Sequence, residues 1–124
     1  MRLITDIQFH SDHVLVICKG QSIRNEDIAS IAETVAHSQS TPAVVLVDVS
    51  RVESFRNLDL SLLWLHCMQA KAKGWQAALV GVPEELRLQI ASGGLDEIIP
   101  TFSTGKDALN TLSQSPKTSA TSAA

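Results

Sequence analysis

Two histidines in one short polar segment are the first candidates for metal chemistry. His10 and His13 lie three residues apart in the segment His10-Ser11-Asp12-His13, so both imidazole rings could approach one metal ion. A zinc site needs at least three protein ligands, and no third ligand follows at a recognisable spacing. The segment is therefore interpreted as a solvated turn, and the sequence predicts no metal site and no cofactor.

The two cysteines, Cys18 and Cys67, are the candidate nucleophiles. Both lie inside apolar runs, which is typical of small buried hydrophobic side chains rather than of activated thiolates. A thiol brought next to His37 or His66 by the fold would be the alternative. The burial interpretation is favoured, and it suits a reducing compartment without disulfides.

Two glycine motifs resemble pieces of phosphate-binding loops. Gly105-Lys106 lacks both the glycine five residues earlier and the Ser or Thr that follows the lysine of a P-loop. Gly93-Gly94 is not preceded by the strand that a dinucleotide-binding turn requires. The sequence thus predicts no catalytic residue and no enzymatic activity.

The elements that position these residues are organised around one central stretch. Val44 to Val47 form an unbroken apolar run, the pattern of a parallel strand covered on both faces. Residues 49–56 are expected to cross the edge of the sheet, and Asn57 to cap a helix with Asp59 in its first turn. Gly74 is expected to end that helix.

The preceding segment predicts a hairpin and a helix. Leu3 to Phe9 alternates between apolar and polar residues, and Val14 to Cys18 is almost wholly apolar, so the second strand should lie inside the sheet. Gly20 is expected to end it. Asn25 is expected to cap a helix whose apolar residues repeat at helical spacing.

The following segment predicts a second parallel strand at residues 75–80, a helix with Pro83 in its first position, and a short strand at Ile98 and Ile99. Thr104 begins a capping-box pattern for a terminal helix. The expected fold is a single α/β domain at residues 1–112, in the order β-β-α-β-α-β-α-β-α, with a mixed sheet of four to five strands and about four helices. Residues 113–124 are rich in Ser, Thr and Ala and are predicted to be a disordered tail.

Composition excludes several classes of function. The 124 residues carry a net charge of −3, and the ten basic residues are scattered, so no electrostatic footprint for nucleic acid is present. No long uncharged apolar run and no signal peptide are visible. A cytoplasmic protein without direct membrane insertion is expected.

The central stretch also resembles a known family. Asp48-Val49-Ser50-Arg51-Val52, followed by the loop and Leu60-Ser61-Leu62-Leu63, is similar to the central motif of STAS domains, the fold of bacterial anti-sigma-factor antagonists. The resemblance extends over roughly residues 1–112. In that family a serine in this loop is phosphorylated by the partner kinase. Counting from either side places that serine at Leu58, with Arg56, Asn57 and Asp59 also departing from the motif.

The resemblance implies a non-catalytic, protein-binding STAS domain. Its expected partner is an anti-sigma factor of the serine-kinase type, and its expected role is partner switching in transcription regulation. Because Leu58 replaces the serine, no phosphorylation is expected at this position. The alternative is an accessory subunit that packs against the ATPase subunit of an ABC-type lipid transporter.

The partner-binding residues are predicted from the surface pattern of the central helix. Helical spacing gathers Asp59, His66 and Gln69 on one polar side of the central helix, where Leu62 falls among them and Leu58 at their border. Exposed leucines are common on protein surfaces, so chance is one explanation. The other is a partner-binding patch of six residues: Phe55, Arg56, Asn57, Leu58, Asp59 and Leu62.

Overall fold

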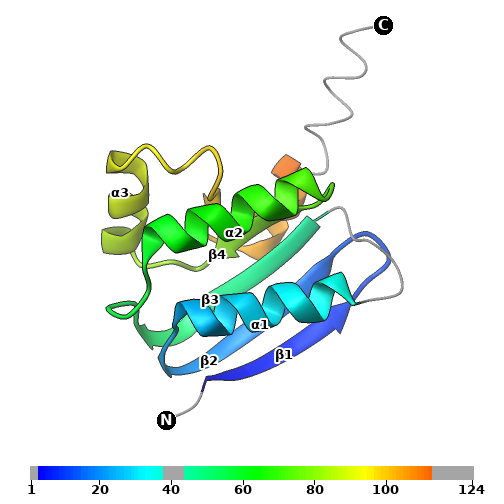
Figure 1. Ribbon diagram of the computed structural model, residues 1–124, viewed down its shortest axis with the longest axis horizontal. Coiled ribbons are helices and arrows are strands. Elements are labelled where there is room, and N and C mark those ends of the chain that lie inside the picture. The colour runs from blue at the N-terminus through cyan, green and yellow to red at the C-terminus, as the bar shows by residue number, and fades with distance from the viewer. Residues whose placement is uncertain (1–2, 38–43, 113–124) are drawn as a thin grey trace, which may run out of the picture.

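The computed structural model describes residues 3–37 and 44–112, which form one five-stranded sheet with helices on both faces (Figure 1). The elements in chain order are β1 (Ile4–Phe9), β2 (Val14–Ser22), α1 (Asn25–Ala36), β3 (Val44–Ser54), α2 (Leu60–Ala72), β4 (Gln76–Val80), α3 (Glu84–Ser92) and β5 (Thr101–Phe102). Residues 105–112 form a further helix. The predicted α/β class, element order and helix number are confirmed. The proposed tail at 113–124 lies outside the described residues.

The sheet is mixed and its strands follow one another in chain order, β1-β2-β3-β4-β5. β1 and β2 form an antiparallel hairpin, while β2, β3, β4 and β5 run parallel. The predicted hairpin, the inner position of β2 and the central parallel pair of β3 and β4 are therefore confirmed.

The sheet separates two apolar cores. The larger core lies under α1, α2 and α3, where Val16, Val47 and Ile90 are almost completely buried. The smaller core lies on the opposite face, where Leu46 and Ala108 of the last helix meet. Both faces of β3 are thus covered, as its unbroken apolar run predicted.

β3 is much longer than the sequence indicated. The expected crossing loop at residues 49–56 is wrong, because the strand continues to Ser54 and stays paired with β2 up to Ser22. The pairing of β2 with β3 shifts register between Ile17 and Lys19. The apolar run of β3 ends near this shift, but the strand itself continues. Val52 is buried beyond the shift, and Gly20 does not end β2.

The last strand also differs from expectation. Ile98 and Ile99 do not form it, because their N–H groups donate to the Leu95 carbonyl at 3.2 and 2.8 Å and close a turn. Ile99 fills the larger core from this turn, and Thr101–Phe102 pairs with β4 instead. Burial of Ile99 therefore explains an apolar signal that resembled a strand.

Helix ends follow the predicted chemistry with small shifts. Pro83 caps α3 rather than standing in its first position, and Gly93 closes this helix as expected. Thr104 Oγ1 accepts from the Asp107 N–H at 3.1 Å, which confirms the predicted cap of the last helix. Gly74 follows α2 at a φ of 95°, a conformation that favours glycine.

Candidate functional site

The candidate surface begins at the tight connection between β3 and α2. Phe55 and Leu58 close this turn, since the Leu58 N–H donates to the Phe55 carbonyl at 3.1 Å. The Arg56 N–H donates to Ser54 Oγ at 3.3 Å. These bonds fix the backbone of the connection, so its side chains stand on a defined scaffold.

Asp59 is the residue that caps α2. Its Oδ1 accepts from the N–H groups of Ser61 at 2.8 Å and Leu62 at 3.3 Å, which satisfies two free donors of the first turn. The prediction that Asn57 caps the helix is wrong by two residues. The reason is that the turn from Phe55 to Leu58 takes up the intervening backbone, and helical geometry starts at Leu60.

Asn25 holds this cap in place from α1, 34 positions earlier in the chain. Its Oδ1 accepts from the Asp59 N–H at 2.8 Å, and its Nδ2 donates to the Asp59 carbonyl at 3.0 Å. The prediction that Asn25 caps α1 is therefore wrong. Arg24 occupies the cap position of α1, and its N–H donates to the Asp27 carboxylate at 2.9 Å.

The six predicted partner-binding residues divide into two groups. Arg56, Asn57, Asp59 and Leu62 are exposed. Phe55 and Leu58 are half-buried and pack against the larger core. Leu58 therefore anchors the connection more than it offers an apolar contact, while Leu62, at 46% exposure, is a free leucine on the surface.

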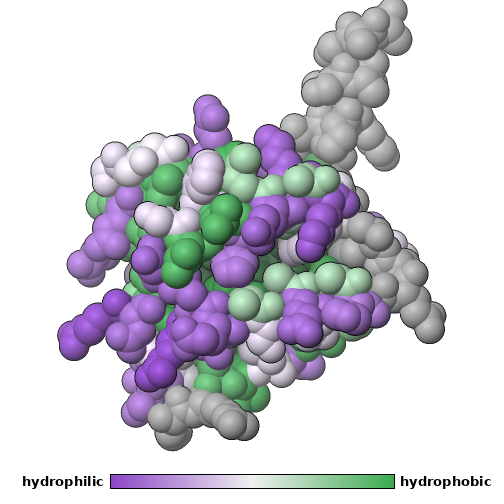
Figure 2. All heavy atoms as spheres, viewed as in Figure 1, coloured by the Kyte–Doolittle hydropathy of each residue, from purple (hydrophilic) through white to green (hydrophobic). Residues whose placement is uncertain are grey.

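Leu65 belongs to this surface and was missed by sequence reasoning. It is 45% exposed and stands three residues after Leu62, which places both on neighbouring positions of the helix surface. Figure 2 shows hydrophobic side chains at the surface over the first half of α2, with hydrophilic side chains around them. The spacing of the two leucines was available as a signal.

A groove of about 550 Å³ adjoins the connection. It separates the connection from α3, and most of its exposed lining surface is polar. Charged groups stand on both sides, from Glu53 and Arg56 on one side and Glu85 on the other. The complete lining is Glu53, Ser54, Phe55, Arg56, Leu58, Pro83, Glu85, Leu86 and Gln89. Its polar lining suits a few side chains of a partner better than the predominantly apolar lining typical of small-molecule sites.

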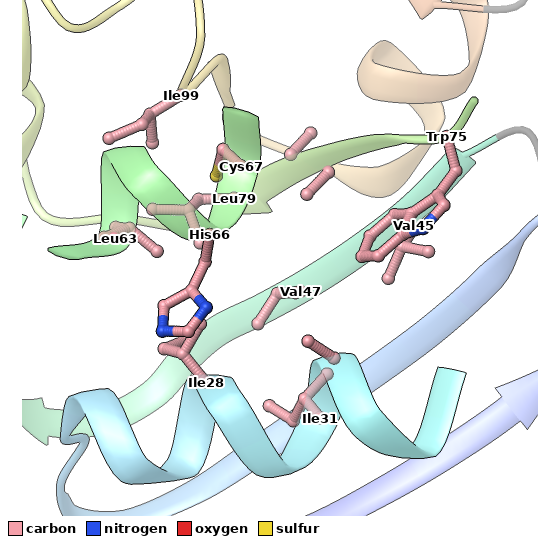
Figure 3. A pocket seen from close by; sticks show the side chains of 13 residues that line it. Ile28, Ile31, Val45, Val47, Leu63, His66, Cys67, Trp75, Leu79 and Ile99 are labelled. Atoms are coloured by element: carbon pink, nitrogen blue, oxygen red, sulfur yellow. The ribbon is translucent and has the colours of Figure 1, made fainter. Parts of the chain in front are cut away.

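A second hollow lies between α1, α2 and the sheet and contains the candidate nucleophile (Figure 3). It is almost wholly apolar and encloses about 40 Å³, far less than a typical small-molecule site. The His66 ring reaches towards Ile28 of α1, whereas Cys67 belongs to the larger core together with Leu79 and Ile99. Both residues line the hollow, but Cys67 is buried in the larger core whereas His66 is only half-buried.

Burial makes both thiols poor nucleophiles. It raises the pKa of Cys67 to about 11. Burial, with smaller contributions from Asp27 and Asp48, raises the pKa of Cys18 to about 12. Both cysteines are free and buried, as the sequence predicted. At neutral pH they are protonated and behave as small apolar side chains.

The two turn histidines lie together at the exposed end of the first hairpin. Their rings stack with centroids 4.5 Å apart, and His13 Nδ1 lies 2.7 Å from Asp12 Oδ1. This hydrogen bond lowers the pKa of Asp12. Across residues 3–37 and 44–112, no group of three or more potential metal ligands is gathered.

Asp48 and Ser50, two residues of the motif that carries the family resemblance, form a local hydrogen-bonded unit. Asp48 Oδ1 accepts from the Ser50 N–H at 2.9 Å and from Ser50 Oγ at 2.7 Å. Gly81 lies against Ser50 so closely that an added Cβ would stand 2.7 Å from the serine Cβ. The motif thus shapes the sheet just before the candidate surface.

Within the described ranges, none of the helices has the length and hydrophobicity needed to cross a bilayer. No protein-family model matches the sequence, and no curated protein sequence is significantly similar to it.

Solved structures share the fold. An anti-sigma factor antagonist from Mycobacterium paratuberculosis is 22% identical, with a TM-score of 0.63 over 90% of this chain and 94% of that chain. RsbS from Moorella thermoacetica is 16% identical, with a TM-score of 0.69 over 91% and 97%. The STAS domain of a SulP transporter from Vibrio cholerae is 9% identical, with a TM-score of 0.62 over 90% and 88%. The chain therefore has the STAS fold, which anti-sigma-factor antagonists and a transporter domain share.

Proposed function

We propose that this chain is a non-catalytic STAS domain that binds another protein through the start of α2. The observation that carries the proposal is the pair of exposed leucines, Leu62 and Leu65, on a helix whose first turn is fixed by Asp59 and Asn25. The first half of α2 carries large apolar side chains on its outer side as well as on its inner side, and an apolar helix face calls for cover. The sheet covers one side of α2, and a partner is proposed to cover the other.

The surroundings of the two leucines suit a protein partner. Arg56, Asn57 and Asp59 are exposed at the helix start and give the apolar contact a polar rim. The groove beside the connection adds charged groups of both signs. An apolar centre with a polar rim is the usual anatomy of a transient protein interface.

The proposed partner is an anti-sigma factor of the serine-kinase type, which the domain would bind to release a sigma factor. The fold shared with anti-sigma-factor antagonists supports this choice. The connection from Phe55 to Asp59 contains no hydroxyl side chain, so a partner kinase would have no acceptor there. We propose that this domain binds its partner without the phosphate switch at Leu58. Cytoplasmic localisation follows from such a role.

A transporter subunit is the second candidate, because a transporter STAS domain shares the fold. In this case the occupant of the α2 surface would be the ATPase subunit of an ABC-type lipid transporter. Neither partner changes the proposed binding surface. The two functions therefore differ in the identity of the partner alone.

Co-purification from the native host, followed by mass spectrometry, tests the proposal. We expect a kinase-like anti-sigma factor with the unmodified chain and its loss with a Leu62→Asp/Leu65→Asp variant. Leu88→Asp is the matched control, since Leu88 is 53% exposed on α3. Recovery of a transporter ATPase would instead support the transporter-subunit function. Retention of the partner by the double variant would contradict binding through the α2 surface.

Incubation with ATP and the co-purified kinase tests the missing switch. Two serines flank the connection: Ser54 is half-buried, and Ser61 is exposed in the first turn of α2. We expect no phosphate on either by mass spectrometry. A phosphate on Ser61 that prevents binding would show that the phosphorylation site lies three residues after Leu58. It would contradict the proposal that the domain binds its partner without a phosphate switch.

A further inference from the structure

The outer edge of β1 is a second surface without a neighbour among the described residues. β1 ends the strand order, and Figure 1 shows no described element beyond it. Of the five large hydrophobic side chains exposed in the described residues, two stand on this strand: Ile4 at 66% and Phe9 at 55%. A six-residue edge with exposed apolar side chains is a template for another strand.

The hydrogen bonds at the hairpin turn show which backbone groups of β1 face outward. The His10 N–H donates to the His13 carbonyl at 2.9 Å, so this pair is hydrogen-bonded. Bonded and non-bonded pairs alternate along an antiparallel ladder. The residues bonded to β2 are therefore the even-numbered ones, and Thr5, Ile7 and Phe9 direct their N–H and C=O groups away from the sheet.

These outward groups are self-complementary. When two copies of β1 lie antiparallel with Ile7 opposite Ile7, Thr5 of each copy stands opposite Phe9 of the other. All three pairs are of the bonded type, which gives two hydrogen bonds each. On the other face, Asp6 stands opposite Gln8 of the second copy, whose amide can donate to a carboxylate. Within one copy the Gln8 Nε2 already donates to Asp6 Oδ2 at 3.0 Å.

Of the two neighbouring registers, one is disfavoured by charge and the other by the length of β1. Centring the pair on Asp6 keeps each side chain on its face but places Asp6 opposite Asp6. Like charges directly opposite one another destabilise a strand pair. Centring the pair on Gln8 instead places Thr5 opposite Ser11, beyond the end of β1, so fewer pairs form within the strand. The register centred on Ile7 also brings exposed Phe9 beside Thr5 and exposed Ile4 beside His10 of the second copy.

We propose that β1 pairs with β1 of a second copy and joins two sheets into one across a two-fold axis at Ile7. The β1 edge is separate from α2, so the partner-binding surface on α2 stays free in each copy of the dimer. The occupant is a second copy of this chain because one register satisfies the outward backbone groups and pairs Asp6 with an amide in both copies.

Size-exclusion chromatography with light scattering tests the dimer. We expect twice the 13.4-kDa chain mass at high concentration. Thr5→Pro removes an outward N–H without touching the bonds to β2 and should weaken dimerisation at least about tenfold, since two bonds are lost per dimer. Thr5→Val keeps the N–H and should leave the dimer intact. A monomer at every concentration, or a dimer unaffected by Thr5→Pro, would overturn the proposal.

Disulfide formation tests the register. Ile7→Cys places two thiols in a directly opposed pair with Cα atoms about 5.5 Å apart, within disulfide reach. Asp6→Cys places them about 8 Å apart, beyond that reach. The native cysteines are buried and do not compete. Oxidation should therefore cross-link the Ile7→Cys variant alone, and cross-linking of Asp6→Cys in preference to it would contradict the proposed register.

Discussion

The two sides of α2 differ sharply although their residues are neighbours in sequence. Leu62 is 46% exposed and Leu63 is 2% exposed. The inner side packs Leu63 and Cys67 against the sheet, while the outer side presents Leu62 and Leu65 to the surface. The side chain of α2 most suggestive of chemistry, the Cys67 thiol, is therefore buried away from water. The two side chains most suggestive of binding, Leu62 and Leu65, are exposed to it.

The largest expected effect comes from placing a charge on each side in turn. Leu63→Asp should cost about 4 kcal/mol or more in unfolding free energy, because the carboxylate would be buried without a partner. Leu62→Asp should change it by less than about 0.5 kcal/mol, as for ordinary surface positions. Urea unfolding of both variants measures the difference. Equal losses would mean that the outer side is also core.

Alkaline pH sharpens the same comparison through the buried thiols. The folded-state pKa values, about 11 for Cys67 and about 12 for Cys18, lie above the ordinary value of 9.0. The unfolded chain therefore releases protons first as the pH rises, and stability present below about pH 9 should fall towards pH 11 to 12. Urea unfolding between pH 8 and 10.5 measures the decline. Cys67→Ala should make it shallower, and an unchanged slope would contradict a buried, protonated Cys67.

Leu58 tests the boundary between the two sides. It packs against the larger core while remaining half-buried. Leu58→Asp should therefore cost about 1 to 2 kcal/mol of stability, part of the value for a fully buried leucine. A melting curve measures the loss. No change in melting temperature would place Leu58 wholly in the exposed patch with Leu62.

Asn25 tests whether the outer surface depends on its support from α1. Asn25→Ala removes the two hydrogen bonds to the backbone of Asp59 and should cost about 1 kcal/mol, because water replaces exposed partners in part. Asn57→Ala is the matched control and should cost less than about 0.5 kcal/mol, since Asn57 is exposed. Thermal unfolding of both variants decides whether Asn57 or Asn25 supports the helix start.

Local patterns predicted most of the fold. The apolar runs that became β2, β3 and β4, the helix stripes and the glycines after the helices act over short distances, so the sequence displays them directly. The length of β3 was not predictable from its apolar run, because exposed Ser50 and Arg51 continue the strand through pairing with β2. Ile98 and Ile99 gave a strand signal although their burial comes from a turn.

The candidate surface was predictable in part. Helical spacing found Leu62 and would have found Leu65 at the next position on the same side. The support from Asn25 was hidden, because its partner lies 34 positions away and no local pattern joins the two. The half-buried state of Leu58 also depended on the tertiary packing of the connection.

Titration of the co-purified partner against the purified domain tests the central claim most directly. Each leucine is about half exposed, so its cover by a partner is worth roughly 1 kcal/mol, and loss of both should weaken binding at least about tenfold. We predict that Leu62→Asp/Leu65→Asp raises the Kd by this factor or more with little change in melting temperature, while Leu88→Asp leaves the Kd unchanged. An unchanged Kd for the double variant would contradict the claim that α2 is the binding surface.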